Sequence, residues 1–537
     1  METVSTSVQS ESEEQKLASS YDEVPYKSYS YPYSHPDYLA TTATIFGMRP
    51  KAIKSCRVLE IGCASGGNLI PMGYSLPQSE FLGIDLSKRQ TDAGQQAIKD
   101  LGLANIEIRN LSVLDVDDKL GEFDYIIAHG VYSWVPTEVQ EKILETCEKR
   151  LSENGVAYIS YNTYPGWHFR GMIRDMMLYH TAQFEDPAVR VAQARYLLTF
   201  LSSSAPAKDD AYAIMLRNEL NILSNQDDSY ILHDHLEETN DPIYFSEFVD
   251  RAEKHGLQYL AEAEFGSMLP SNFPNEVFFT LRRIANDIVR MEQYMDFVRN
   301  RMFRQTLLCR QGIQLNRDLD PHNLINFFVA SPAKPILESV EIESVKTASF
   351  GIRVGATLNP PHPLVKTAFE HLAKIYPQSV SFQDLLLVAC SQATPDSLKD
   401  KSALDRDALT LATELLNAYK SKIVKFRIEK SSFVTDVSDK PTASAFARYE
   451  AKTSMKITNQ LHTPVDVDPF IQKLVTLLDG KLDKQQILEQ LIKQAEDGVL
   501  MAQDGQPFAS RQDLAEKLGT TMEFALRSMS KSALLTS

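Results

Sequence analysis

From Arg57 onward, short runs of apolar and β-branched residues alternate with longer stretches in which apolar positions recur every three or four residues. The apolar runs are RVLEIG, FLGIDLS, IEIRNLS, FDYIIAHG and GVAYISYN. Strands that alternate with helices form βαβ units, so the pattern predicts a parallel sheet covered by helices on both faces. We therefore expect a doubly wound, Rossmann-like α/β domain over residues 40–170, with its ligand site beyond the carboxyl ends of the strands.

Beyond Gly171 the helical period dominates. Amphipathic patterns predict helices over residues 172–201 and 209–223, and the stretch 274–310 also has the pattern of a helix. Since none of these segments shows the strand motifs of a second sheet, we predict a mostly helical middle domain at residues 171–315.

Two further units are predicted in the distal part of the chain. Short strand candidates at 336–344 and 350–356, followed by two helices with a Ser-rich link, predict a mixed, winged-helix-like domain at residues 316–440. A similar order of helix, turn and helix predicts a helical C-terminal domain at residues 441–537. Its first part, residues 441–469, is interpreted as a linker or as a β-hairpin.

Residues 1–39 are expected to form an N-terminal arm. The first 20 residues are rich in Ser and Glu, which is typical of a mobile segment. The next stretch, YDEVPYKSYSYPYSHPDY, is rich in tyrosine and interrupted by Pro25, Pro32 and Pro36. It predicts an extended arm that lies on a surface, where its tyrosines can cover a ligand.

Composition narrows the class of protein. The 537 residues are 43% apolar and 23% charged, which is ordinary for globular domains. The net charge of −16 disfavours nucleic acid as a partner. We see neither a long apolar run nor a secretory signal, so we expect a cytoplasmic protein without membrane insertion. The five cysteines are scattered without zinc-finger spacing, so no structural metal is expected.

The most specific motif is VLEIGCASGGNL at residues 58–69, a strand that ends in a glycine-rich turn and opens a helix. The turn reads GxxxGG, whereas the dinucleotide fingerprint requires GxGxxG and a Walker A loop requires Lys-Ser or Lys-Thr after the glycines. With Glu60 two residues before the first glycine, the spacing resembles the adenosylmethionine loop of class I methyltransferases. Asp85 ends the second strand, where a carboxylate can accept both hydroxyl groups of a ribose or simply cap the strand.

The candidate cofactor site combines this turn with the ends of the following strands. Ser112 ends the third strand, where it either lies beside the adenine amine or caps a helix, and Asp115 is the alternative for the adenine role. The fourth strand ends at His129, where the methionine moiety is expected. The candidate cofactor residues are Glu60, Gly62, Cys63, Gly66, Asn68, Asp85, Leu86, Ser112, Asp115 and His129.

Aromatic residues cluster at the ends of the fourth and fifth strands, in VYSWVP and YNTYPGWH. Both ends face one crevice in this topology, so we expect the rings to rim an acceptor site, although aromatic residues are more often core. An aromatic slot suits an alkylammonium group, with lysine as the obvious acceptor, and a Tyr hydroxyl or the Asn162 carbonyl can orient its amine. The candidate catalytic residues are Tyr161, Asn162, Tyr164, Trp167, His129, Tyr132 and Trp134.

The motif HDH at residues 233–235 places two histidines close together without a third metal ligand. Such a pair is more typical of hydrogen bonding at a surface or in a core than of a metal site. We therefore expect no metal there.

Together, these motifs resemble bacterial class I methyltransferases with a methyltransferase regulatory domain, including the rickettsial-type outer-membrane-protein lysine methyltransferases. The resemblance rests on segments 21–26, 58–72, 81–87, 129–136, 161–177 and 233–264, the last of which is similar to the regulatory domain. It implies S-adenosyl-L-methionine as cofactor, S-adenosyl-L-homocysteine as product and a protein lysine as acceptor.

The resulting hypothesis is an S-adenosylmethionine-dependent protein-lysine N-methyltransferase whose partner is a lysine-bearing protein of the outer membrane or cell surface. Two alternatives stay open. One is a small-molecule methyltransferase, although several hundred residues outside the catalytic domain favour a macromolecular acceptor. The other is a non-catalytic scaffold that binds the same cofactor, against which the intact glycine turn and Asp85 argue.

Overall fold

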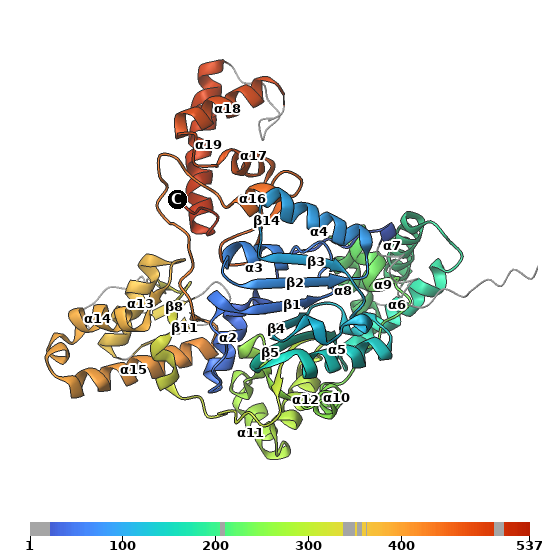
Figure 1. The fold of residues 1–537 in the computed structure, drawn as a ribbon, viewed down its shortest axis with the longest axis horizontal. Coiled ribbons are helices and arrows are strands. Elements are labelled where there is room, and N and C mark those ends of the chain that lie inside the picture. The colour runs from blue at the N-terminus through green and yellow to red at the C-terminus, as the bar shows by residue number, and fades with distance from the viewer. Residues whose placement is uncertain (1–21, 205–209, 337–348, 352–356, 361, 499–509) are drawn as a thin grey trace, which may run out of the picture.

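The computed structural model describes residues 22–204, 210–336, 349–351, 357–360, 362–498 and 510–537. Its central sheet contains β1 (Arg57–Ile61), β2 (Glu80–Asp85), β3 (Ile106–Asn110), β4 (Phe123–Ala128), β5 (Leu151–Asn162), β6 (Leu257–Glu262) and β7 (Phe303–Arg310). The strand order is β3-β2-β1-β4-β5-β7-β6 (Figure 1). β1 to β5 are parallel, and β7 runs antiparallel between β5 and β6. The predicted α/β fold class is confirmed.

Successive residues of the central strands enter two different hydrophobic cores, because side chains alternate between the faces of a sheet. Val58 and Tyr125 lie in one core, whereas their neighbours Leu59 and Ile126 lie in the other. The first core includes residues of α2 (Pro36–Ile45), α3 (Leu69–Ser75) and α4 (Lys88–Leu101). The second includes residues of α5 (Thr137–Arg150) and α10 (Phe245–Lys254). Helices thus cover both faces and leave the strand ends for a ligand site.

The middle of the chain is helical, but it also completes the sheet. Its helices are α6 (Trp167–Thr181), α7 (Pro187–Ser204), α8 (Ala211–Leu223), α9 (Asp228–His235), α11 (Asn275–Ile284) and α12 (Ile288–Arg299). The single helix predicted over residues 274–310 is wrong, since α11 ends at Ile284 before α12 begins at Ile288. Asn300 then ends α12 with a left-handed φ of 50°, and β7 follows. The run Leu307–Cys309 fits a helix as well as a strand, and it is buried in the sheet between β5 and β6.

Two distal units project from the sheet domain (Figure 1). The first contains α13 (Pro363–Ile375), α14 (Phe382–Ala393), α15 (Lys401–Lys420) and the small sheet of β12 (Val380–Ser381), β8 (Phe328–Ala330) and β13 (Lys425–Arg427). Another small sheet joins β9 (Lys334–Ile336), β10 (Ser349–Gly351) and β11 (Thr357–Leu358). The strand candidates at 336–344 and 350–356 fall largely outside the described residues.

The second distal unit has its own hydrophobic core. It contains α16 (Ala445–Glu450), β14 (Lys456–Thr458), β15 (Pro464–Asp466), α17 (Pro469–Leu477), α18 (Lys484–Glu496) and α19 (Arg511–Lys531). β14 and β15 form an antiparallel hairpin, so residues 441–469 are a folded part of this unit and not a linker.

Residues 25–31 of the N-terminal arm form neither helix nor strand, and the backbone of Tyr31 is extended, with φ −117° and ψ 103°. Pro32 and Pro36 then occupy the first positions of a short helical turn and of α2, which places Tyr38 in a helix instead of the extended arm. Proline favours such first positions because its fixed φ suits a helix and its missing N–H is not needed there. The expectation for residues 1–21 lies outside the described residues.

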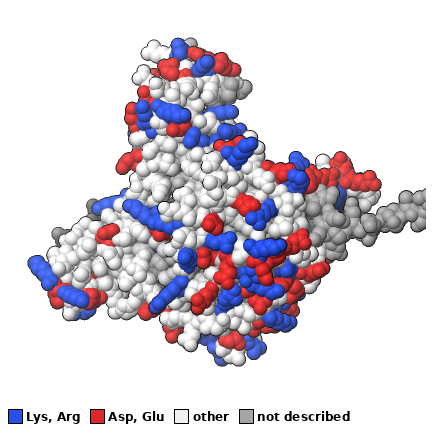
Figure 2. All heavy atoms as spheres, in the orientation of Figure 1, with Lys and Arg blue, Asp and Glu red and all other residues white. Residues whose placement is uncertain are grey.

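Acidic and basic side chains are interspersed over the face of the sheet domain shown in Figure 2. This arrangement gives that face no extended basic field for polyphosphate. Across the described ranges, no helix has the length and apolar character needed to cross a membrane. The same ranges contain no cluster of three or more His, Cys, Asp or Glu residues suited to hold a metal ion.

Candidate active site

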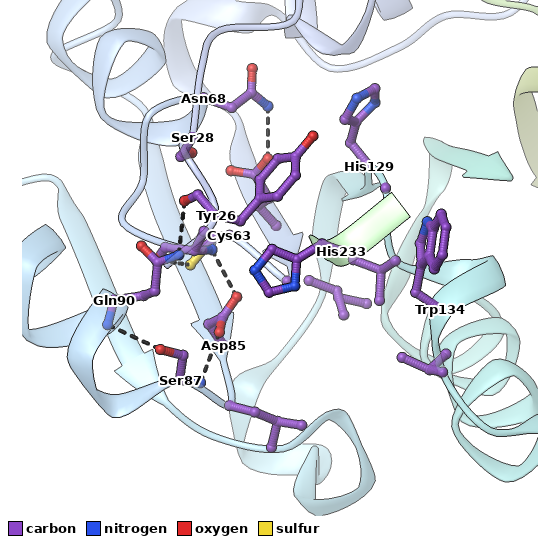
Figure 3. Close-up of a pocket in the computed structure, with 18 of the residues that line it drawn as sticks. Tyr26, Ser28, Cys63, Asn68, Asp85, Ser87, Gln90, His129, Trp134 and His233 are labelled. Atoms are coloured by element: carbon purple, nitrogen blue, oxygen red, sulfur yellow. Dashed lines mark hydrogen bonds between the residues drawn. The ribbon is translucent and has the colours of Figure 1, made fainter. Parts of the chain in front are cut away.

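A cavity of about 380 Å³ lies at the carboxyl ends of β1, β2 and β4, where the topology places a ligand site (Figure 3). Small-ligand pockets usually measure roughly 300–1,000 Å³. The predicted residues that line it are Glu60, Gly62, Cys63, Asn68, Asp85, Leu86, His129, Trp134, Asn162 and Trp167. The glycine turn and the ends of the neighbouring strands therefore converge on one cavity.

Two glycines of the turn have backbone conformations that other residues rarely adopt. Gly62 has a φ of +70°, and a Cβ placed on it would lie 2.3 Å from Cγ2 of Val131. Gly66 has a φ of +78°, and its Cβ would lie 2.7 Å from Cδ1 of Ile108. The turn therefore requires glycine at both positions. Gly66 shapes the turn without lining the cavity itself.

Asp85 anchors the glycine turn from the end of β2. Its carboxylate accepts hydrogen bonds from the backbone amides of Ala64 at 2.8 Å and Ser87 at 2.9 Å. Burial raises the pKa of this carboxyl group, and the two amide bonds oppose the rise. Because the group also lines the cavity, it can accept the hydroxyl groups of a ribose.

Glu60 presents an unused acceptor to the cavity. Its Oε1 accepts a hydrogen bond from Nδ2 of Asn68 at 2.7 Å, whereas its Oε2 is buried without a hydrogen-bond partner among the described residues. Burial raises the pKa of Glu60 to about 8. A buried acceptor without a partner costs free energy, so the site fits a ligand that brings a donor, such as an amino group.

Asn68 links the cavity to the second distal unit. Its Oδ1 accepts hydrogen bonds from the amide of Tyr31 and from Nε2 of His462, both at 2.8 Å, and its Nδ2 also donates to the Ser34 hydroxyl at 3.0 Å. His462 is buried and belongs to the loop between β14 and β15. Nothing in the local sequence around His462 indicates this contact, since it joins residues 394 positions apart.

The N-terminal arm covers part of the cavity, as the tyrosine-rich pattern suggested. Tyr26, Ser28 and Tyr31 line it. The Ser28 hydroxyl accepts a hydrogen bond from the Gly67 amide at 2.9 Å, and the Tyr31 ring lies on His129 with centroids 3.6 Å apart. The arm therefore closes one side of the cavity over the glycine turn.

His129 is a neutral part of the cavity wall. Burial lowers its pKa to about 3, and its Nδ1 lies 2.8 Å from the Tyr158 hydroxyl. A histidine with this pKa is uncharged at neutral pH and is too weak a base to accept a proton there. Its position agrees with the predicted cofactor role more closely than with acid–base catalysis.

The aromatic end of the cavity is formed by fewer residues than predicted. Trp134 and Trp167 line it, with rings edge to face and centroids 6.2 Å apart. Asn162 lines it too, and its Nδ2 donates to Oδ1 of Asn240 at 3.1 Å. Figure 3 shows Trp134 across the cavity from Asp85.

Several predicted residues do not reach the cavity. Tyr161 is fully buried, stacks on Phe248 with centroids 4.1 Å apart, and its hydroxyl lies 3.0 Å from that of Thr306. Side chains alternate along β5, so Asn162 faces the cavity whereas Tyr161 faces the core. Tyr132 is buried in the same core.

Three other candidates also lie outside the cavity lining. Tyr164 stacks on His168 with centroids 4.0 Å apart. The Ser112 hydroxyl accepts a hydrogen bond from the Leu114 amide at 3.1 Å, which is the helix-cap alternative, and Asp115 follows in the same short helical turn. The carboxyl end of β3 instead contributes Leu111 and Val113 to the lining.

Four residues of α6 and α9 that line the cavity were not predicted as site residues, namely Arg170, Tyr230, His233 and Asp234. They lie in the middle segment, far along the chain from the glycine turn. The HDH motif was the signal that could have identified two of them. His233 and Asp234 belong to the cavity wall, whereas His235 does not line it.

Three family models match parts of the chain. A methyltransferase domain matches residues 59–157, a predicted methyltransferase regulatory domain matches residues 227–310, and the PKMT C-terminal winged helix domain matches residues 439–534. The predicted regulatory domain and a winged helix in the C-terminal part of the chain are confirmed. The winged-helix match lies in the second distal unit and not at residues 316–440, where the sequence analysis placed the winged-helix-like domain.

Two relatives extend this similarity over nearly the whole chain. The chain is 38% identical to an uncharacterized protein of Rickettsia prowazekii (strain Madrid E), over 96% of this chain and 93% of that protein. PKMT2 from Rickettsia typhi has a TM-score of 0.84 at 33% identity, over 96% of this chain and 100% of that one. Its complex with AdoHcy has a TM-score of 0.83 at 33% identity, with the same coverage. The chain therefore belongs to the family of bacterial class I methyltransferases with a regulatory domain and a PKMT-type winged helix, and its cofactor is S-adenosylmethionine.

Proposed function

We propose that this methyltransferase transfers methyl groups to lysine side chains of a protein. The observation that carries the proposal is the aromatic end of the cavity, which Trp134 and Trp167 line together. Trp134 lies across the cavity from Asp85 (Figure 3). Aromatic walls attract an alkylammonium group and remove its water. The related domain and structures, in whose names PKMT stands for protein lysine methyltransferase, support the same acceptor.

The chain's own residues supply position and environment to the reaction. Asp85 would hold the ribose hydroxyls and Glu60 the amino group of S-adenosylmethionine, which supplies a methyl group activated by its sulfonium. The N-terminal arm keeps water away from the cavity. A free lysine amine at pH 7 costs about 4–5 kcal/mol relative to the ammonium, since the unperturbed pKa is near 10.4, and desolvation between aromatic rings reduces this cost.

We further propose that the acceptor is an outer-membrane or cell-surface protein, methylated in the cytoplasm before export. The resemblance to methyltransferases of outer-membrane proteins supports this choice. The two distal units also support a macromolecular acceptor, since a small molecule needs no more cover than the N-terminal arm provides.

The proposal is tested with purified protein, methyl-labelled S-adenosylmethionine and a cell-envelope extract, followed by mass spectrometry of the labelled products. We expect label on lysine side chains of one or a few proteins. An Asp85→Ala variant serves as the control for enzyme-dependent label. Label found only on small metabolites would favour a small-molecule acceptor, and cofactor binding without label on any product would favour a non-catalytic scaffold.

Binding of S-adenosylhomocysteine is expected to release a proton near pH 7. The raised pKa of Glu60, about 8, keeps its carboxyl group mostly protonated in the free protein. A ligand ammonium that donates to Glu60 favours the ionised form and lowers its pKa. Affinity should therefore increase as pH rises from about 6 to about 8 and then level off.

Calorimetry in buffers of different ionisation enthalpy measures this proton release. We expect Glu60→Gln to abolish it, because glutamine cannot ionise. Lys88 and Asp92 form an exposed pair on α4, so Asp92→Asn is a suitable control that should leave the release unchanged. Equal proton release by Glu60→Gln and the original protein would contradict the role assigned to Glu60.

A further inference from the structure

The HDH segment contributes two residues to the cavity wall and one to a buried pair. His233 and Asp234 line the cavity, whereas His235 is fully buried and its Nε2 lies 3.1 Å from Oε1 of Glu219. His233 is also engaged, since its Nε2 donates to the carbonyl oxygen of Val24 at 2.6 Å and thereby fixes the N-terminal arm to α9. Both histidines thus have structural partners, which leaves Asp234 to be explained.

The carboxylate of Asp234 forms no hydrogen bond or ion pair with other residues that the structure describes. The nearest strong cation, Arg170, is paired with Glu219, with Nε 3.0 Å from Oε1. Asp234 is therefore a carboxylate in a largely enclosed space whose charge lacks a dedicated counterion. Such a group requires either a proton or a cationic ligand.

The surroundings of Asp234 favour an organic cation. Tyr230 lies one turn earlier on α9, and Trp167 lies on α6 with its ring 5.5 Å from the Arg170 guanidinium. Aromatic side chains that line the same cavity as a carboxylate suit an alkylammonium, which gains both a charge partner and contact with ring faces. A metal ion would instead require several oxygen or nitrogen ligands.

We propose that Asp234 binds the ammonium group of the acceptor lysine and accepts its proton. This inference rests on the proposed lysine acceptor. The proton passes from the lysine nitrogen to a carboxylate oxygen of Asp234, which leaves a neutral amine. The lone pair of that amine then forms the new N–C bond while the methyl C–S bond breaks, and the electron pair of the broken bond stays on sulfur. Asp234 returns the proton to solvent before the next turnover.

The charges around Asp234 agree with this role. Burial raises its pKa to about 7, and the positive charge of Arg170, together with His233, opposes the rise. Tyr31 on the N-terminal arm and Tyr230 on α9 face the same carboxyl group and stay neutral, since burial raises the pKa of Tyr230 to about 12 and that of Tyr31 further. A proton acceptor works best when its pKa lies near the working pH.

The test compares Asp234→Asn with Asp228→Asn, which removes the same charge from the exposed start of α9. The probes are S-adenosylhomocysteine for calorimetry and the cell-envelope extract for the initial rate of lysine labelling. We expect Asp234→Asn to bind S-adenosylhomocysteine within about twofold of the original protein and to label lysine at least about tenfold more slowly at pH 7.5. Asp228→Asn should match the original protein in both measurements.

The dependence of the labelling rate on pH separates proton transfer from a structural effect. In the original protein the rate should rise up to about pH 7 and then form a plateau, whereas in Asp234→Asn it should keep rising about tenfold per pH unit toward the lysine pKa. Lysine labelling by Asp234→Asn at the original rate would overturn this inference alone. Loss of S-adenosylhomocysteine binding in Asp234→Asn would instead show that Asp234 binds the cofactor and not the acceptor lysine. Absence of lysine label with the original protein would overturn both this inference and the proposed function.

Discussion

Replacing Arg304 with methionine is expected to lower the free energy of unfolding by about 3–5 kcal/mol. Arg304 is fully buried in β7. Its guanidinium contacts the carboxylates of Glu262 at 2.7 Å, Glu292 at 3.0 Å and Asp296 at 2.7 Å. Methionine fills much of the same volume but leaves these carboxylates with the more distant Arg301 as the remaining ion-pair partner among the described residues.

The loss of unfolding free energy in Arg304→Met should depend on pH. Without Arg304 the buried carboxylates have higher pKa values in the folded protein than in the unfolded chain, so the folded state binds more protons and gains stability as pH falls. The difference between Arg304→Met and the original protein should thus be larger at pH 8 than at pH 6.

Urea unfolding measures both effects, with fluorescence from Trp134 and Trp167, the two tryptophans of the chain. Arg282→Met is the matched control, because Arg282 is exposed on α11, and it should change stability by less than about 0.5 kcal/mol. Equal stability of Arg304→Met and Arg282→Met would show that the buried cluster contributes nothing net to folding.

An Asp85→Ala variant should bind S-adenosylhomocysteine at least about 100-fold more weakly. Hydrogen bonds to a charged group contribute about 1.5–3 kcal/mol each, and the variant loses those to the ribose as well as the support of the glycine turn through Ala64. Isothermal calorimetry measures the affinity directly.

Two further variants define the cause of this loss. Asp85→Asn keeps one acceptor oxygen and should fall between Asp85→Ala and the original protein. Asp92→Ala removes an exposed carboxylate of α4 and should leave the affinity unchanged. An affinity for Asp85→Ala equal to that of Asp92→Ala would exclude Asp85 from the cofactor site.

The parts of the fold that a motif or an apolar run of a few neighbouring residues indicates could be predicted from the sequence. The glycine turn, Asp85 and the first five strands each follow from a motif or an apolar run within a few residues. β7 could not be recognised in this way, because three consecutive buried residues, Leu307–Cys309, fit a helix as well as a central strand. Its identity depends on pairing with β5 and β6, which only tertiary structure supplies.

The residues of the candidate active site divide in the same way, into those that a local sequence pattern indicates and those that only tertiary contacts bring together. Trp134, Trp167 and Asn162 were found because strand ends meet at one edge of the sheet, but Tyr161 was misplaced because a neighbour one position away on a strand faces the opposite side. Asp234 lines the cavity from α9, and His462 contacts the lining residue Asn68 from the second distal unit. Their roles depend on contacts across the fold that no spacing in the sequence encodes.

The hydrogen bond between His462 and Asn68 couples the cofactor cavity thermodynamically to the second distal unit. A ligand that orders Asn68 and Glu60 would also stabilise the hydrogen bond from His462, and by reciprocity any change that breaks this bond should weaken ligand binding by the same factor. We therefore expect cofactor binding to be coupled to the docking of the second distal unit, through His462 together with the hydrogen bonds between Ser30 and Thr458 and between Tyr74 and Ala445.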